Sequence, residues 1–176
     1  PPWIADKGFS GETIMIEPGS GFGIGSHPTT QLCIRWLEDQ ISMNDTVLDY
    51  GCGSGILSII SKTLGAKKVI GIDNDHQALR NAERNKQLNS IEIDFFHIDN
   101  YQGSLKYDIV IANILLNTLI SLKETLISSL NPNGILILTG ILKDQAIELI
   151  SAFSPDINLS IIEEQEGWLL FQGKNS

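Results

Sequence analysis

Cysteine, basic side chains and long apolar runs are all scarce in this sequence, and each scarcity excludes a class of protein. The two cysteines, Cys33 and Cys52, have no CxxC spacing and no paired histidines. A disulfide framework and a zinc site are therefore not expected, and a reducing compartment, the cytoplasm, is favoured. Apolar runs such as Ile109 to Ala112 are far shorter than the roughly 18 residues that span a bilayer, so we expect no membrane segment.

Positive charge is in deficit as well. Lys and Arg number 12 against 21 Asp and Glu, which gives a formal net charge of −9. Binding to a phosphate backbone requires clustered basic side chains that release counterions. The charge balance therefore argues against nucleic acid as a direct partner.

The composition is that of a folded domain. Hydrophobic residues make up 42% of the 176 positions and charged residues 19%, which is enough for one well-packed core. The chain starts at Pro1 without a methionine or the features of a signal peptide. We therefore expect it to be a processed or truncated piece of a longer protein.

Short β-branched runs alternate with longer helical patterns, which is typical of βαβ units and a parallel sheet. One helical face is expected within 56–64, another within 74–88 with Asp75 as N-cap, and a third within 116–130, so that each strand has its crossover helix. The predicted strands are Thr46–Tyr50, Lys68–Asp73, Glu92–His97, Tyr107–Ala112 and Gly134–Gly140.

Both ends of the chain extend this pattern. After the fifth strand we expect a helix over Asp144–Phe153 and then two antiparallel strands, Leu159–Glu164 and Trp168–Gln172, at the sheet edge. Before the first we expect a short strand over Thr13–Ile16 and a helix over Thr29–Glu38. The predicted fold is a doubly wound α/β architecture, a mostly parallel seven-stranded Rossmann-like sheet with an antiparallel edge strand.

A glycine loop joins the first of the central strands to its helix. Gly51, Gly53 and Gly55 have the spacing GxGxG, and Ile56 stands where a dinucleotide-binding GxGxxG turn has its third glycine. Glycines let a backbone approach a ligand closely, and a helix N-terminus offers free N–H groups. Asp49, before the loop, suits a cationic ligand better than a pyrophosphate. The loop favours S-adenosylmethionine over a nicotinamide dinucleotide.

Polar side chains follow the next strands. Asp73 ends the second and can accept hydrogen bonds from both ribose hydroxyls, although nicotinamide enzymes place an acid similarly. Asp99 and Asn100 follow the third, where a side chain can meet the adenine amino group. Asn113 ends the fourth, at the edge where open α/β sheets bind ligands, and is the candidate for orienting a methyl acceptor.

Simpler interpretations compete with these. Asn113 can cap the next helix, Asp99 can belong to ordinary turn chemistry, and His27 can be a loop histidine with its hydrogen bonds satisfied. Cys52 is interpreted as a small filler of the loop, because its motif holds no partner histidine.

Together these motifs resemble a known family. The segments Pro18–Thr30, Leu48–Leu57 and Ala112–Leu115, with Gly140–Leu142 and Glu166–Trp168, resemble the bacterial methyltransferases of ribosomal large-subunit protein eleven, members of the class I S-adenosylmethionine-dependent methyltransferases. The resemblance covers nearly the whole chain. Ile24 departs from it, because the family usually has a threonine there.

The resemblance implies a domain organisation and a set of site residues. Residues 1–30 are expected to form a connecting segment and a glycine-rich loop that covers the cofactor, and residues 31–176 the methyltransferase domain. A small N-terminal substrate-recognition domain is expected to be absent from these 176 residues. With the residues argued above, the site is expected to comprise His27 and Asn113 as catalytic residues and, as cofactor-binding residues, Phe22, Gly23, Thr30, Asp49, Gly51, Gly53, Gly55, Asp73, Asn74, Asp99 and Asn113.

The implied activity is transfer of a methyl group from S-adenosylmethionine to lysine side chains and α-amino groups of ribosomal large-subunit protein eleven, leaving S-adenosylhomocysteine, with no metal. Alternatives remain open. They are a class I methyltransferase of a small molecule, a nucleic acid or a release factor, a nicotinamide oxidoreductase, and a non-enzymatic binding module. The run Asn113 to Leu116 argues against the N-adenine and glutamine enzymes, which favour Asn-Pro-Pro-Tyr after the fourth strand.

Overall fold

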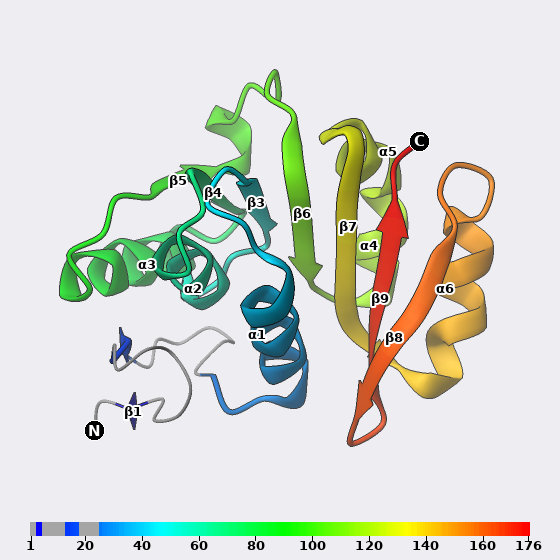
Figure 1. Ribbon diagram of the computed structural model, residues 1–176, viewed down its shortest axis with the longest axis horizontal. Coiled ribbons are helices and arrows are strands. Elements are labelled where there is room, and N and C mark those ends of the chain that lie inside the picture. Colours follow the sequence, from blue (N-terminus) through cyan, green and yellow to red (C-terminus); the bar gives the residue numbers. More distant parts are fainter. Residues whose placement is uncertain (1–2, 5–12, 18–24) are drawn as a thin grey trace.

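Seven strands of the computed structural model form one sheet, in the order β5-β4-β3-β6-β7-β9-β8 (Figure 1). The structure describes residues 3–4, 13–17 and 25–176. Strands β3 to β7 pair in parallel, and β9 is antiparallel to both of its neighbours. The strands are β3 Thr46–Tyr50, β4 Lys68–Asp73, β5 Asp94–His97, β6 Tyr107–Asn113, β7 Leu130–Leu142, β8 Leu159–Gln165 and β9 Trp168–Lys174.

Alternate strand residues feed two separate apolar cores, one on each face of the sheet. In β3, for example, Val47 joins one core and Leu48 the other, as the two-residue period of a strand requires. The core with Val47 holds apolar residues of α1 (Pro28–Gln40) and α2 (Ile56–Thr63). The core with Leu48 is covered by α4 (Leu116–Ser121), α5 (Lys123–Ser128) and α6 (Ala146–Phe153). Helices on both faces confirm the doubly wound prediction (Figure 1).

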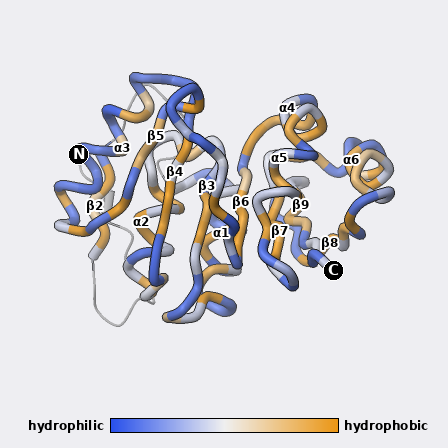
Figure 2. The backbone as a smooth tube through the Cα atoms, turned by 90° about the horizontal axis from the view of Figure 1, so that it is seen from above, coloured by the Kyte–Doolittle hydropathy of each residue, from blue (hydrophilic) through white to orange (hydrophobic). Residues whose placement is uncertain are grey.

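Helix α3 (His76–Leu88) flanks the β5 end of the sheet and packs with few apolar residues. Only Ala78, Ala82 and Asn85 are buried along it, and its tube is predominantly hydrophilic in Figure 2. Its N-cap is the predicted one, because the Asp75 side chain accepts a hydrogen bond from the backbone N–H of Gln77 at 2.7 Å. A side-chain oxygen in this position satisfies a donor that the first helical turn leaves free.

Two details differ from the sequence prediction. Strand β5 is joined to β6 by the 3-10 turn Ile98–Asn100 and not by a crossover helix. The helical stretch expected within 116–130 is two short helices, and Leu130 already belongs to β7. The expected antiparallel pair at the sheet edge is confirmed: β9 pairs antiparallel with β7 and with β8, and β8 forms the edge itself.

A separate two-stranded ribbon lies outside the main sheet. Its strands are β1 (Trp3–Ile4) and β2 (Met15–Ile16), which pair antiparallel. Ile14 and Ile16 are buried in the core that α1 and α2 cover. Strand β2 is therefore packed onto the side of the sheet that α1 and α2 cover, and it also contacts Asn89 at the end of α3. The segment expected at Thr13–Ile16 is confirmed as a shorter strand, and β1 was not predicted.

Candidate functional site

The carboxyl ends of β3, β4, β5 and β6 lie at one edge of the sheet, because these strands are parallel and in register. Asp73 is paired with His97 across β4 and β5, and Asn113 with Thr139 across β6 and β7. Tyr50, the last residue of β3, pairs with Ile72, so that the Gly51–Gly55 loop starts beside Asp73. This edge is where open α/β sheets bind ligands.

The glycine loop is held in a fixed shape by the neighbouring strand. The backbone N–H groups of Gly51 and Cys52 both donate to the carbonyl of Ile72, at 2.8 and 2.9 Å. Gly51, Gly53 and Gly55 have φ values of 79°, 55° and 78°, a left-handed conformation that costs other residues about 1–2 kcal/mol. The left-handed backbone conformation of the loop therefore explains why glycine stands at all three positions.

Asp73 stabilises this loop by a hydrogen bond and can accept further hydrogen bonds. Its Oδ2 accepts a hydrogen bond from the Gly53 N–H at 2.8 Å, and its Oδ1 accepts one from the Asp75 N–H at 2.9 Å. The side chain is half-buried. An ionised carboxylate offers about four lone-pair positions, so two remain for the paired hydroxyls of a ribose. These free acceptor positions fit the ribose hydroxyls in the nucleoside part of S-adenosylmethionine.

Asp49 lies behind the loop and contacts the start of α2. Its carboxylate is 1% exposed, and Oδ2 accepts hydrogen bonds from the backbone N–H and the hydroxyl of Ser58, at 3.0 and 2.7 Å. Burial raises its pKa to about 6, against the lowering effect of the Ser58 bonds. The carboxylate thus orients the helix that begins after the loop, and the direct contact with a cationic ligand stays a prediction.

His97 joins the two turns that follow β4 and β5 through both of its ring nitrogens. Its Nε2 donates to the carbonyl of Asn74 at 3.0 Å, and its Nδ1 accepts from the backbone N–H of Asp99 at 3.3 Å. The ring of His76 stacks on it at 4.1 Å between centroids. These contacts connect the two turns that carry the exposed Asn74 and Asp99, the residues expected near adenosine.

Ile114, the residue after Asn113, lies directly against the glycine loop. A Cβ built on Gly51 would lie 2.5 Å from Cγ2 of Ile114, and one built on Gly140 would lie 2.5 Å from the Ile114 carbonyl oxygen. Glycine at position 51 therefore lets the turn after β6 approach the loop, and glycine at position 140 lets the same turn approach β7. Asn113 is half-buried, and its backbone is part of the β6–β7 ladder.

The other predicted site residues that the structure describes lie at the start of α1. His27 is its N-cap, and Nδ1 accepts from the Thr29 N–H at 3.3 Å, while the ring meets Trp168 of β9 edge-on at 5.0 Å. Thr30 is buried in the first turn. Phe22 and Gly23 lie outside the described residues. A catalytic role for His27 stays a prediction, and its capping bond supports the simpler interpretation as well.

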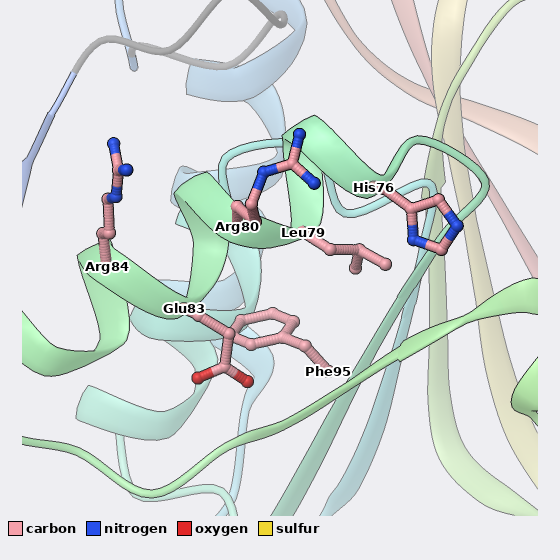
Figure 3. A pocket seen from close by; sticks show the side chains of 6 residues that line it. All are labelled: His76, Leu79, Arg80, Glu83, Arg84 and Phe95. Carbon is pink, nitrogen blue, oxygen red and sulfur yellow. The ribbon is translucent and has the colours of Figure 1, made fainter.

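A pocket of about 320 Å³ lies next to this edge, between α3 and β5, and none of its lining residues belongs to the predicted site. Arg80 and Arg84 extend together away from the ring of Phe95, while Glu83 lies below them (Figure 3). The side chains do not converge on one point. The remaining lining residues are His76 and Leu79.

Within the described ranges, no group of three or more His, Cys, Asp or Glu side chains is arranged to hold a metal ion. In the same part of the chain, no helix combines the length and apolar character needed to cross a membrane.

The strand order and the glycine loop define a Rossmann-like methyltransferase fold, and solved structures share it. The ribosomal protein L11 methylase of Lactobacillus delbrueckii subsp. bulgaricus matches with a TM-score of 0.78 and 32% identity, over 86% of this chain and 81% of that one. A Thermus thermophilus 16S rRNA methyltransferase, solved with AdoMet and guanosine, matches with a TM-score of 0.80 over the whole chain and 50% of its own, at 17% identity.

Comparison of the sequence with known families assigns the chain to a particular family within this fold. The profile of the family described as "Ribosomal protein L11 methyltransferase (PrmA)" matches residues 1–176, and the chain belongs to that family. A relative from Chromobacterium violaceum, named Ribosomal protein L11 methyltransferase, is 42% identical over 98% of this chain and 58% of its own length. The chain spans about half the length of the curated relatives it matches.

Proposed function

We propose that this chain binds S-adenosylmethionine at the carboxyl edge of β3, β4 and β6 and transfers its methyl group to a protein amine. The observation that carries the proposal is the Asp73 carboxylate at the end of β4, which accepts the Gly53 N–H and still has two acceptor positions for a ligand. The backbone of Gly51 to Gly55 would face the amino-acid part of the cofactor. Asp99 and Asn74, joined through His97, would contact the adenine side.

For the methyl transfer itself, the protein mainly has to position the acceptor nitrogen relative to the methyl group. The bound cofactor supplies a methyl group on a sulfonium, and the acceptor must present a neutral nitrogen about 3 Å away in line with it. A lysine with a pKa near 10.4 is about 0.04% neutral at pH 7, a cost of roughly 4.6 kcal/mol. Enclosing the amine lowers this cost because burial disfavours the ammonium form.

Asn113 is the proposed residue for orienting that amine. It lies at the end of β6, next to Ile114, which contacts the glycine loop. Its side-chain oxygen can accept one N–H of the acceptor nitrogen, and a backbone carbonyl of the same turn can accept another. His27 is the proposed proton relay.

We infer that the acceptor is ribosomal protein L11, at lysine side chains and α-amino groups. The family assignment and the names of the relatives support this inference. A basic acceptor protein also suits a chain of charge −9, because opposite charge speeds encounter. With a substrate of this kind we propose that the enzyme acts in the cytoplasm and has neither nucleic acid nor membrane as a direct partner.

Transfer of labelled methyl groups tests the proposal. Purified L11 is incubated with the chain and labelled S-adenosylmethionine, and the modified residues are located by peptide mass spectrometry. Label on lysine or the N-terminal amine is expected. Label on nucleic acid or on a small molecule, with none on L11, would instead support one of the other methyltransferase classes.

A further inference from the structure

Two asparagines of α3 and a third at its C-cap contact the backbone of residues 15–17. Asn81, Asn85 and Asn89 are four residues apart and therefore share one face of the helix. Asn89 accepts from the Met15 N–H at 2.8 Å and donates to the Met15 carbonyl at 2.7 Å. Asn81 donates to the Glu17 carbonyl at 3.4 Å. The helix thus binds the backbone of residues 15–17 with side-chain amides.

Asn85 differs from the other two because it also reaches the glycine loop. Its Oδ1 accepts from the Glu17 N–H at 2.8 Å, and its Nδ2 donates to the Ser54 carbonyl at 2.9 Å. It is 0% exposed. A buried amide with donor and acceptor both occupied has little freedom to turn, since either bond, once lost, leaves an unpaired polar group.

Ser54 lies between two of the loop glycines, so its carbonyl controls the backbone on either side. On one side Gly53 is fixed by Asp73, and on the other Gly55 begins α2. Strand β4 therefore holds the first half of the loop, and Asn85 of α3 holds the second. Glycines by themselves provide no such restraint, because they populate many backbone conformations.

We propose that Asn85 is a positioning residue for the S-adenosylmethionine site, which links the Ser54 carbonyl of the cofactor loop to the backbone of residues 15–17. The inference rests on the proposed cofactor. Because coupling between two sites is reciprocal, ligand at the loop strengthens attachment of residues 15–17, and attachment of residues 15–17 strengthens ligand binding.

The substitution Asn85→Asp separates the two branches of this link. The introduced carboxylate still accepts from the Glu17 N–H but has no proton to donate to the Ser54 carbonyl. Asn89→Ala is the matched control, because it removes the contacts to Met15 and leaves Ser54 bound to Asn85. Affinity for S-adenosylhomocysteine is measured by calorimetry for both variants and the wild type, at a temperature where all three are folded.

We expect Asn85→Asp to weaken binding about tenfold near pH 8, and Asn89→Ala to weaken it less than about twofold. Lowering the pH toward about 5 protonates the introduced buried carboxyl, whose O–H then donates to the Ser54 carbonyl. The affinity of Asn85→Asp should therefore recover relative to that of the wild type. Comparison with the wild type at the same pH corrects for every other group that titrates. A residue that only supports the fold would show no such recovery.

The outcomes separate this inference from the proposed function. The positioning role alone is overturned if the wild type binds S-adenosylhomocysteine and Asn85→Asp binds it with the same affinity. It is also overturned if Asn85→Asp and Asn89→Ala lose affinity equally at every pH. A wild-type chain that does not bind S-adenosylhomocysteine contradicts the proposed function, and the positioning role with it.

Discussion

At the scale of single residues, Asp73 holds the glycine loop and is proposed to bind the ribose hydroxyls. Its effect on ligand binding can be measured separately from its effect on stability. The change Asp73→Ala removes charge-assisted hydrogen bonds worth about 1.5–3 kcal/mol, so S-adenosylmethionine should bind about tenfold to a hundredfold more weakly. Asp75→Ala is the control, because it removes the α3 cap and keeps the backbone N–H that Asp73 accepts. Titration calorimetry compares the three proteins. Equal affinity in Asp73→Ala and wild type would refute the ribose assignment.

Asn113 should show the opposite kinetic pattern. In the proposed site it aligns the acceptor amine and does not hold the donor, so Asn113→Ala should lower kcat more than it weakens cofactor binding. Steady-state methyl transfer and calorimetry on the same preparation measure the two effects. If affinity falls as steeply as turnover, Asn113 is a cofactor ligand and the acceptor is held by other groups.

Asp49 should make the fold pH-dependent in an unusual direction. Its pKa is raised from 3.8 to about 6 by burial, so its contribution to stability is complete below about pH 4 and declines as pH rises through 6. Relative to Asp49→Asn, the wild type should lose about 1 kcal/mol of unfolding free energy between about pH 5 and pH 7. Denaturant unfolding at both pH values measures the difference. Parallel pH profiles for the two proteins would show that Asp49 is not a buried, raised-pKa acid.

At the scale of elements, the glycine loop depends on shape as well as on backbone freedom. Gly51 and Gly167 have similar φ values, 79° and 83°, but a Cβ on Gly51 would meet Ile114 whereas one on Gly167 would meet nothing within 4 Å. Gly167→Ala should therefore cost about 1–2 kcal/mol from φ strain alone, with S-adenosylmethionine affinity unchanged. Gly51→Ala should cost more and weaken binding.

Adding Ile114→Ala to Gly51→Ala tests the cause. Removal of the Ile114 branch should restore part of the lost stability, because the clash is with its Cγ2. Thermal unfolding measures this recovery. No recovery in the double variant would place the whole cost in the backbone conformation.

The elements that the sequence predicted best are those with strong local signals. Strands β3 and β4 were placed to the residue, because an apolar β-branched run ends in each case at polar or glycine punctuation. The start of β7 was missed because Asn131, Pro132 and Asn133 are typical of a turn. There the strand is held from a distance, through Asp108, which accepts from the Asn131 side chain at 2.7 Å.

Site residues divide in the same way. Asp73 and Asn113 end strands and Gly51 follows one, so their shared edge could be predicted from the parallel topology. Asn85 and His97 could not, because their partners are set by tertiary packing. Asn85 contacts residues 31 and 68 positions away, and no local periodicity reports such a pair.

At the scale of the whole molecule, the proposed substrate needs more than the catalytic edge. A net charge of −9 favours encounter with a basic protein, but long-range charge does not select which amine enters the site. The relatives are about twice as long as the part that this chain matches. We therefore predict that the 176 residues methylate L11 more slowly than the full-length Chromobacterium violaceum relative at equal cofactor saturation. Equal rates would place substrate recognition within these residues.

Cofactor identity is the claim on which all of these proposals depend, and one titration tests it most directly. The 176-residue chain is titrated calorimetrically with S-adenosylmethionine and, separately, with NAD, in a buffer that contains a metal chelator. Saturable binding of one S-adenosylmethionine per chain is predicted, with no heat from NAD and no effect of the chelator. Saturable binding of NAD, or no binding of S-adenosylmethionine, would contradict the account of this site.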